Sequence, residues 1–348
     1  MFNFKSKQLL PKDIGIDLGT SSVLVYVEGK GIVINEPSIV AVDTNTDCIA
    51  KIGKDAQMML GRAPAHLELV RPLKDGVISR YDVAQKMIQY FIRRACDDAI
   101  FRPRVVICIP TGISDVEERA VIEAGSQGGA RRTYLVREPV AAAVGAGVDV
   151  HSPVGSMIVD IGGGTTDVAV ISLGGVVVSE SICVAGNKFD EAIMRYVRGK
   201  YNVTIGERTA EQIKIRIGAV YEHGVAKTMD VKGRCLVQGL PKVVTLSSKE
   251  MLEAMMEPIS AVIDTIYSVI EQTPPELMGD ILRGGIIMTG GGSLLYGMDR
   301  LIEDVTGIRT RVAKNPIDCV ALGTGKILKV LDNVPEGLID LSHIKQKI

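Results

Sequence analysis

Two stretches of the chain share one order of hydrophobic and polar positions. Residues 13–27 and residues 157–173 each pass from an apolar, β-rich run through an Asp and a Gly turn with hydroxyl side chains into a second β-rich run. Short apolar runs on either side of a Gly-containing turn are typical of a β-hairpin. The pattern therefore predicts two matched hairpins, in which Asp17 and Asp160 occupy equivalent positions just before the turn.

Each predicted hairpin is followed later in the chain by the same series of elements. Residues 104–125 and residues 284–307 both indicate a strand, a turn and an amphipathic helix. Residues 137–147 and residues 314–325 both place a proline ahead of a helix rich in small side chains, and proline is favoured in the first turn of a helix. This repeated order predicts an α/β fold of two duplicated halves that face each other.

Two segments interrupt the repeat and predict a smaller inserted subdomain in each half. They cover residues 37–80 and residues from about 190 to 250. The second segment contains two helical patterns and a strand-rich piece at 228–246. Residues 249–272 then carry apolar side chains at a spacing of three and four, which predicts a long helix that Pro258 could kink.

The composition narrows the classes of function. The chain has 348 residues, of which 46% are hydrophobic and 23% charged, enough apolar surface for large cores in two domains. Its net charge of −1 argues against a nucleic-acid binder, because phosphate binding needs a basic surplus. The 6 cysteines form no CxxC pair, so free thiols are expected. No apolar run reaches the roughly 18 residues that a membrane-spanning helix needs.

The N-terminal segment mixes hydrophobic and basic side chains. Lys5 and Lys7 lie among the apolar residues Phe2, Phe4, Leu9 and Leu10. Such a segment could lie on a membrane surface with its apolar side chains in the lipid. It could also be a frayed tail, and the residues alone leave both interpretations open.

The glycine-rich turns are suited to binding phosphate. A Gly turn at the end of a buried strand allows backbone N–H groups to converge on an anion, and neighbouring hydroxyls add donors. A single turn of this kind is often only a turn, but two matched turns could clamp a polyphosphate from both sides. The candidate residues are Gly19, Thr20, Ser21 and Ser22 in the first turn and Gly162, Gly163, Gly164 and Thr165 in the second.

An aspartate precedes each of these turns. Asp17 and Asp160 would flank the same phosphates, where two carboxylates are suited to hold Mg²⁺, mainly through water because Mg²⁺ dehydrates reluctantly. Either aspartate alone could instead cap its turn.

Other motifs suggest where the rest of a nucleotide would bind. Neither a P-loop nor a well-placed dinucleotide fingerprint is present in the sequence. The glycines at 290–292 lie between a predicted strand and a predicted helix, where they could take the nucleoside or the α-phosphate. Glu211 and Lys214 share one helical face and could grip a ribose or base edge, or form a surface ion pair. Glu138, directly before Pro139, could orient an attacking water or simply cap its helix.

Together these motifs resemble those of a known family. The segments IGIDLGTSS, VDIGGGTTDVAVISLG, REPVAAAVGAG, IGERTAEQIK and IIMTGGGSLL resemble the nucleotide motifs of actin and Hsp70-like ATPases. NEPSIVAVD, RPLKDGVI, TPPELMGDILRGGI and NPIDCVALGTG are similar to segments of the MreB/Mbl group of bacterial actins. The resemblance to this group covers nearly the whole chain.

The resemblance implies a fold and its division. The fold would be an α/β, actin-like ATPase fold of two duplicated RNase H-like lobes, each with an inserted smaller subdomain, and ATP with Mg²⁺ would bind in the cleft between the lobes. Lobe I would comprise residues 1–152, with residues 326–348 returning to it. Lobe II would comprise residues 153–325.

The resemblance also implies roles for individual residues. Phosphate contacts would fall on the two turns, Glu138 would be the catalytic glutamate, and Thr165 or Thr166 would help to place the attacking water. The nucleoside contacts would be Glu211, Gln212, Ile213, Lys214, Gly290, Gly291, Gly292, Ser293 and Leu294.

The family's biology is implied in the same way. We expect a slow ATPase that polymerises into double antiparallel filaments on the inner membrane face and organises cell shape, with membrane proteins of the shape machinery as partners. The membrane contacts would be Phe2, Phe4, Ile100 and Phe101. A nucleotide-binding scaffold with little hydrolysis, or a small-molecule kinase of the same superfamily, is the alternative.

Two positions depart from the family's pattern. The first turn reads DLGTSS where DLGTAN is usual, so it lacks an amide side chain. Arg137 precedes Glu138 where many relatives carry an acid or alanine. A cation there would favour the charged carboxylate and alter water activation, so hydrolysis should be affected more than nucleotide binding.

Overall fold

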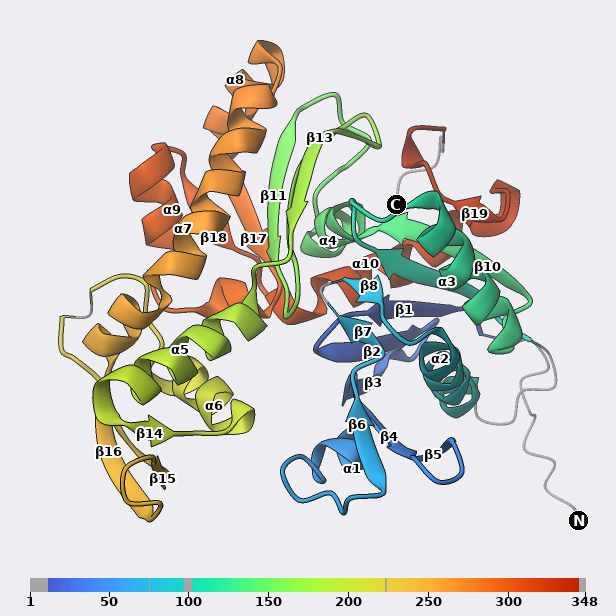
Figure 1. The fold of residues 1–348 in the computed structure, drawn as a ribbon. Coiled ribbons are helices and arrows are strands. Elements are labelled where there is room, and N and C mark those ends of the chain that lie inside the picture. Colours follow the sequence, from blue (N-terminus) through green and yellow to red (C-terminus); the bar gives the residue numbers. More distant parts are fainter. Residues whose placement is uncertain (1–11, 75, 97–101, 223, 344–348) are drawn as a thin grey trace, which may run out of the picture. The chain divides into compact units, whose positions relative to one another are not determined.

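The described part of the chain is shown as a ribbon in Figure 1. The structure, a computed structural model, describes residues 12–74, 76–96, 102–222 and 224–343. The four residues expected to touch a membrane, Phe2, Phe4, Ile100 and Phe101, lie outside these ranges. No helix in the described part is long and apolar enough to cross a membrane.

The described chain divides into two compact units. Unit 1 contains the chain up to Pro153, Ser172–Gly175 and the chain from Asp318 onwards. Unit 2 contains Val154–Ile171 and Val176–Ile317. The first predicted hairpin therefore lies in unit 1, and the second lies in unit 2 except for its last two residues.

Unit 1 is built on a six-stranded sheet with the order β19-β10-β9-β1-β2-β3. The strands are β1 (Ile14–Leu18), β2 (Ser22–Val27), β3 (Gly31–Pro37), β9 (Arg104–Ile109), β10 (Arg132–Arg137) and β19 (Gly337–Leu338). The antiparallel pairing of β1 with β2 confirms the first predicted hairpin. Because β1, β9 and β10 are parallel, their carboxyl ends lie at one edge of the sheet.

Helices cover both faces of this sheet. α2 (Tyr81–Cys96) and α3 (Asp115–Gln127) contribute to the same core as Ile14 and Ile16 of β1. α10 (Cys319–Ile327) packs against Gly15. Because successive residues of a strand face opposite sides of the sheet, Gly15 lies on the face opposite to Ile14 and Ile16, and α10 therefore covers that face.

The fourth helix of unit 1, α4 (Glu138–Ala146), packs against α10 through small residues. A Cβ added to Gly145 would come within 1.8 Å of the Cys319 carbonyl oxygen, and Lys326 Nζ donates to the Val144 carbonyl at 2.6 Å. The resemblance implied that residues up to 325 belong to lobe II. This packing instead joins α10 to unit 1, and the chain then continues through the 3₁₀ turns η3 (Leu328–Asn333) and η4 (Leu341–His343).

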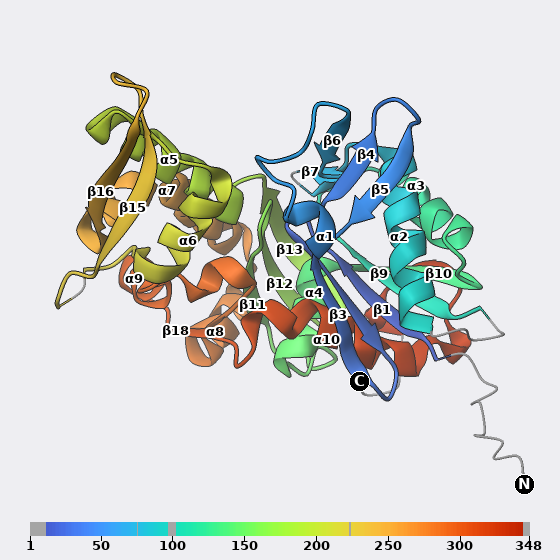
Figure 2. The same cartoon turned by 90° about the horizontal axis from the view of Figure 1, so that it is seen from below.

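The predicted insertion in the first half forms a small sheet of its own (Figure 2). Its strand order is β5-β4-β6, and the hairpin β7–β8 connects it to α2. The elements are β4 (Val40–Asp43), β5 (Cys48–Ile52), α1 (Lys54–Gln57), β6 (Leu67–Val70), β7 (Leu73–Lys74) and β8 (Val77–Ile78).

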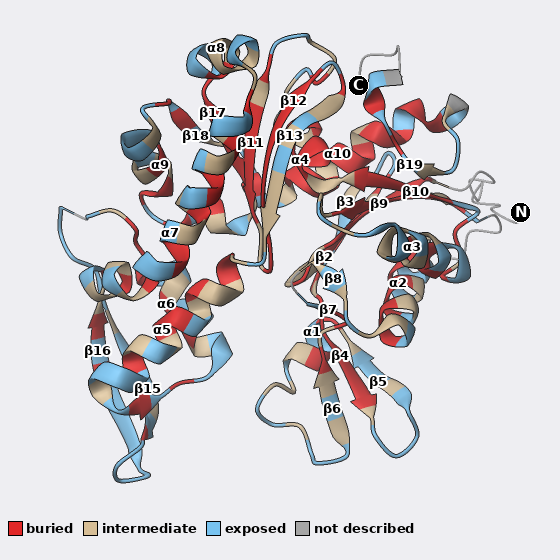
Figure 3. Ribbon diagram, turned by 45° about the horizontal axis from the view of Figure 1, so that its top comes forward, coloured by how far each residue is buried: buried red, intermediate tan, exposed pale blue. Residues whose placement is uncertain are grey.

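Unit 2 is built on a five-stranded sheet with the order β13-β12-β11-β17-β18. The strands are β11 (Ser156–Ile161), β12 (Thr166–Ser172), β13 (Gly175–Ile182), β17 (Ile286–Thr289) and β18 (Thr310–Val312). The antiparallel pairing of β11 with β12 confirms the second predicted hairpin, and β17 runs parallel to β11. The strands nearest the centre of this sheet are almost entirely buried (Figure 3).

The second insertion contains the two predicted helices and the predicted strands, together with one short strand that was not predicted. They are α5 (Gly186–Tyr201), β14 (Val203–Thr204), α6 (Glu207–Ile217), β15 (Thr228–Cys235) and β16 (Pro241–Ser247). The predicted long helix is α7 (Ser248–Gln272), which continues through Pro258. Its start is fixed by a capping box in which the side chains of Ser247 and Glu250 each bond the other's backbone N–H.

Shorter helices complete unit 2 after α7. They are α8 (Pro275–Gly284), the 3₁₀ turn η1 (Gly291–Leu294), α9 (Met298–Thr306) and the 3₁₀ turn η2 (Pro316–Asp318) at the boundary with unit 1. The Gly cluster and α9 follow β17 directly, which confirms the predicted order of strand, turn and helix.

Candidate functional site

The turn of the first hairpin is closed by one backbone bond. Gly19 N–H donates to the Ser22 carbonyl at 3.1 Å, so Thr20 and Ser21 form the tip. A Cβ on Gly19 would lie 2.8 Å from that carbonyl oxygen, which explains the glycine. Asp17 lies two residues before the closing bond, at a position that is 8% exposed.

The turn of the second hairpin has the same register. Gly162 N–H donates to the Thr165 carbonyl at 2.9 Å, so Gly163 and Gly164 form the tip. Asp160 again lies two residues before the closing bond. The two turns therefore correspond residue by residue, as the sequence repeat predicted.

The first residue of α4 lies at the same sheet edge as the first turn. Glu138 follows β10 directly, and β10 is parallel to β9 and β9 to β1, so Glu138 and the tip residues Thr20 and Ser21 share the carboxyl edge. Thr20 Oγ1 accepts the N–H of Gly76 at 3.1 Å, which leaves its own hydrogen available for donation. Unit 1 thus brings its predicted phosphate and catalytic residues to one edge.

Arg137, which precedes Glu138, is engaged with α3 and the loop before it. Its guanidinium donates to the Thr111 carbonyl at 2.8 Å and lies 3.7 Å from the Glu118 carboxylate. The positive charge expected beside Glu138 is therefore partly balanced by Glu118, a contact that the sequence did not predict.

In unit 2, Asp160 is buried opposite a second carboxylate. Asp167 of β12 is its cross-strand partner, and the two residues are 3% and 1% exposed. Thr289 Oγ1 donates to Asp160 Oδ1 at 2.8 Å. Burial raises the pKa of Asp160 to about 7; the bond from Thr289 opposes this shift and the nearby Asp167 adds to it. Asp167 was absent from the sequence-based candidates, although counting back from the turn pairs it with Asp160.

The two threonines after the second turn differ in their environments. Thr166 is fully buried, and its Oγ1 donates to the Val184 carbonyl at 2.7 Å. Thr165 is 8% exposed, and its hydroxyl forms no hydrogen bond with any residue that the structure describes. Of the two hydroxyls, that of Thr165 is the one available to a ligand.

The start of α5 fixes the orientation of the second turn. The N–H groups of Gly186 and Asn187 donate to the carbonyls of Gly162 and Gly163 at 3.2 and 2.8 Å. In a planar trans peptide the C=O and the N–H point in opposite directions. The amide N–H groups of Gly163 and Gly164 therefore point away from α5, side by side, which is the arrangement of an anion-binding nest.

The predicted nucleoside residues of α6 divide into exposed and buried groups. Glu211 and Gln212 are exposed, whereas Ile213 is completely buried in the core, so its side chain is not available to a ligand. Lys214 Nζ donates to Asp190 Oδ2 at 2.8 Å and to the Gly186 carbonyl at 2.9 Å. The ion pair of Lys214 is thus with Asp190 of α5, which the sequence did not predict.

The Gly cluster of unit 2 packs directly on the end of β11. A Cβ on Gly290 would lie 2.2 Å from the Ile161 carbonyl oxygen, and one on Gly292 would lie 2.3 Å from the Ile161 side chain. Ser293 is buried and its Oγ donates to the Gly290 carbonyl at 2.7 Å, whereas Gly291 and Leu294 are exposed. This packing places the cluster beside Asp160 and the second turn.

The donor set suits a hydrated cation better than a protein-enclosed one. The described residues include no group of three or more His, Cys, Asp or Glu side chains that could hold a metal ion. Asp17 in unit 1 and Asp160 in unit 2 are each a single carboxylate, and Asp160 already accepts a bond from Thr289. Mg²⁺ prefers oxygen ligands and keeps several waters, so either aspartate fits Mg²⁺ only with water and phosphate as its main ligands.

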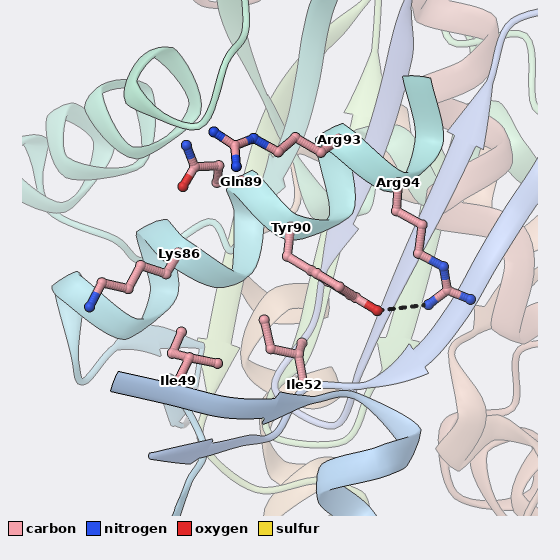
Figure 4. Close-up of a pocket in the computed structure, with 7 residues that line it drawn as sticks. All are labelled: Ile49, Ile52, Lys86, Gln89, Tyr90, Arg93 and Arg94. Carbon is pink, nitrogen blue, oxygen red and sulfur yellow. Dashed lines mark hydrogen bonds between the residues drawn. The ribbon is translucent and has the colours of Figure 1, made fainter. Parts of the chain in front are cut away.

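A separate groove lies elsewhere in unit 1, between α2 and β5 (Figure 4). Its lining residues are Ile49, Ile52, Lys86, Gln89, Tyr90, Arg93 and Arg94. Arg94 forms an ion pair with Glu36, which is 5% exposed. Arg94 therefore has a structural role within unit 1. None of the site residues predicted from the sequence lines this groove.

Comparison with known proteins identifies the class and then the family. The structure of MreB5 of Spiroplasma citri bound to ADP matches with a TM-score of 0.88 and 38% identity, covering 93% of this chain and 99% of that one. A second structure of that protein, bound to AMPPNP, matches with the same TM-score and identity and covers 92% and 97%. The fold is therefore an actin-like ATPase fold.

Comparison of the sequence with known families and proteins agrees with the structural comparison. The profile of the MreB/Mbl protein family matches residues 11–336. The cell shape-determining protein Mbl of Bacillus subtilis (strain 168) is 46% identical over 329 residues, covering 94% of this chain and 99% of that protein. The cell shape-determining protein MreB of Escherichia coli (strain K12) is 47% identical over 334 residues, covering 94% and 96%. This chain belongs to the MreB/Mbl family.

Proposed function

We propose that this chain binds ATP with Mg²⁺, hydrolyses it slowly and assembles into filaments that organise cell shape. The observation that carries the proposal is the second turn, where α5 holds two carbonyls and leaves the N–H groups of Gly163 and Gly164 directed outwards. The relatives support it, since MreB5 of Spiroplasma citri was solved with ADP and with AMPPNP. The curated relatives are named for determining cell shape.

In this proposal both turns bind the phosphates of one nucleotide. Thr20, Ser21 and Ser22 of unit 1 and Gly163, Gly164 and Thr165 of unit 2 donate to phosphate oxygens. Asp17 and Asp160 hold Mg²⁺ through water, and the bound ion would neutralise charge on those oxygens. The α6 residues Glu211, Gln212 and Lys214 and the cluster Gly290–Leu294 surround the nucleoside.

Hydrolysis requires a group that orients water. Glu138 begins α4, where the helix dipole favours its charged form, and Thr165 has the available hydroxyl. We assign the positioning of water to these two residues. Thr166 supports the strand through Val184.

Assembly and membrane contact complete the proposal. We propose double antiparallel filaments on the inner face of the membrane, with Phe2, Phe4, Ile100 and Phe101 as lipid contacts and membrane proteins of the shape machinery as partners. The near-neutral net charge of −1 supports a chain that does not bind nucleic acid.

The test measures binding, hydrolysis and assembly separately. Equilibrium binding of a fluorescent ATP analogue with Mg²⁺, phosphate release, and sedimentation with and without ATP and lipid vesicles are compared for wild type and Glu138→Ala. We expect both proteins to bind nucleotide and only the wild type to release phosphate. A wild type that stays monomeric with ATP and lipid would contradict filament formation. Equal, near-zero phosphate release in both proteins would favour the nucleotide-binding scaffold.

A further inference from the structure

We propose that Asp190 is a positioning residue of the nucleotide site, which acts by holding Lys214 against the first turn of α5. The inference rests on the proposed function, because it concerns the same phosphate-binding turn. Asp190 lies on α5 and Lys214 on α6, 24 positions later in the chain.

The contacts form a continuous path from α6 to the phosphate turn. Lys214 Nζ is held by Asp190 Oδ2 at 2.8 Å and by the Gly186 carbonyl at 2.9 Å. The N–H of Gly186 then donates to Gly162, and the next N–H, that of Asn187, donates to Gly163. These bonds orient the two outward N–H groups of the turn. An ammonium fixed on Gly186 therefore fixes the donors that the phosphate would meet.

The space around Gly186 shows how closely these parts fit. A Cβ on Gly186 would lie 3.3 Å from the Gly162 carbonyl oxygen and 3.3 Å from Lys214 Nζ. The ion pair is also shielded from water, since the Lys214 and Asp190 side chains are 17% and 13% exposed. A shielded pair is screened less by salt and holds a more definite geometry than a surface pair.

The buried carboxylate of Asp190 lowers the stability of the folded state, which argues that the residue has a role other than stabilising the fold. Its Oδ1 is buried and has no hydrogen-bond partner in the described part of the chain. Burial raises the pKa of Asp190 to about 6, although the charge and the hydrogen bond of Lys214 lower it and Glu211 and Glu207 raise it further. Because the folded state binds the proton more tightly than the unfolded chain, the charged carboxylate costs stability above pH 6. A costly buried charge beside a ligand site is typical of a functional group.

The charged groups around Asp190 determine how nucleotide affinity should depend on pH. Lys214, Glu211 and Glu207 face it from α6, whereas Lys188 and Glu191 of α5 pair with each other at the surface, 2.9 Å apart. When Asp190 is protonated, Lys214 loses its counter-charge and its hold on Gly186 weakens. Nucleotide affinity should therefore fall as the pH falls through about 6.

The experiment compares Asp190→Asn with a matched control on the same helix, Glu191→Gln. The dissociation constant of a fluorescent, non-hydrolysable ATP analogue with Mg²⁺ is measured on the full chain between about pH 5 and pH 8, together with the melting temperature. We expect Asp190→Asn to weaken binding on the order of tenfold, which is ~1.4 kcal/mol. We also expect its nucleotide affinity to lack the fall through about pH 6 that the wild type should show. Glu191→Gln should bind like the wild type. Titration of the ligand's own phosphate affects all three proteins alike and cancels in the comparison.

A double-mutant cycle keeps the inference testable if one variant folds poorly. Lys214→Gln and the double variant Asp190→Asn/Lys214→Gln are measured in the same way. If the two residues act through one contact, the double variant binds no more weakly than the weaker single variant. Additive losses, or an Asp190→Asn protein with wild-type affinity and pH dependence, would overturn the inference. If the wild type itself binds no nucleotide, it is the proposed function that fails.

Discussion

Asp160 and Asp167 lie directly opposite each other on the antiparallel strands β11 and β12, and both are almost completely buried. Like charges at opposed positions of a sheet repel each other, and burial adds the cost of removing a carboxylate from water. Thr289 donates one bond to Asp160 in compensation. The strand that leads into the second turn thus contains a carboxylate whose charged form is unfavourable where it is buried.

The first prediction concerns the pH dependence of stability. The pKa of Asp160 rises from 3.8 to about 7 on folding, so the folded state holds the proton more tightly across this window. Stability of the nucleotide-free protein should therefore decrease as the pH rises from 3.8 to about 7 and then level off. Asp160→Asn should reduce the total loss of stability across this window by a few kcal/mol, because each pKa unit corresponds to about 1.4 kcal/mol.

The measurement is urea unfolding of wild type and Asp160→Asn at several pH values without nucleotide. Asp190→Asn is a useful comparison, since it should remove a slope that ends near pH 6. A variant Asp160→Asn as pH-dependent as the wild type would show that the carboxylate is not the group responsible.

The second prediction concerns the close packing of the Gly cluster. Gly290→Ala would place a methyl group 2.2 Å from the Ile161 carbonyl and force a side chain into a backbone with a φ of 79°. We expect a loss of at least about 1–3 kcal/mol in the free energy of unfolding, measured with urea.

Gly199→Ala is the matched control, because this glycine lies within α5 and an added Cβ would meet nothing within 4 Å. Since alanine is favoured over glycine in helices, we expect a gain of roughly 0.5–1 kcal/mol. Equal effects at the two positions would contradict the packing described for the Gly cluster.

The third prediction concerns the start of α7. Ser247→Ala removes the side chain that accepts from the Glu250 N–H and should cost ~1 kcal/mol of stability. Ser114→Ala removes the corresponding bond of the capping box of α3 in unit 1 and should cost a similar amount. Thermal unfolding checks both. A loss below the error of the measurement at both sites would show that neither cap limits stability.

The elements were predictable because their signals are local. Hairpins 13–27 and 157–173 are visible from runs of apolar residues around a Gly turn, and register follows from counting outwards from the turn. The contacts that complete the site are different. Lys214 bonds to Asp190 and Arg137 approaches Glu118, and each pair joins separate elements whose packing no local pattern specifies.

Ile213 is an instructive case between these extremes. It lies within a motif segment, so it was grouped with the nucleoside contacts. Ala210, Ile213 and Ile217 nevertheless recur at a helical spacing of three and four, and all three are buried on the core side of α6. Periodicity would have separated Ile213 from the exposed Glu211 and Gln212.

The last prediction separates the two threonines after the second turn. Thr166→Val removes the donor to the Val184 carbonyl and should cost about 1–3 kcal/mol of stability, because that carbonyl loses its partner in a buried site. Thr165→Val removes a hydroxyl that bonds to no described residue and leaves no partner unsatisfied, so it should cost less stability than Thr166→Val. If Thr165 positions water, its variant should lower phosphate release by about 10²-fold or more while nucleotide affinity changes little. Single-turnover phosphate release and urea unfolding of both variants decide the assignment, and the reverse pattern would transfer the role to Thr166.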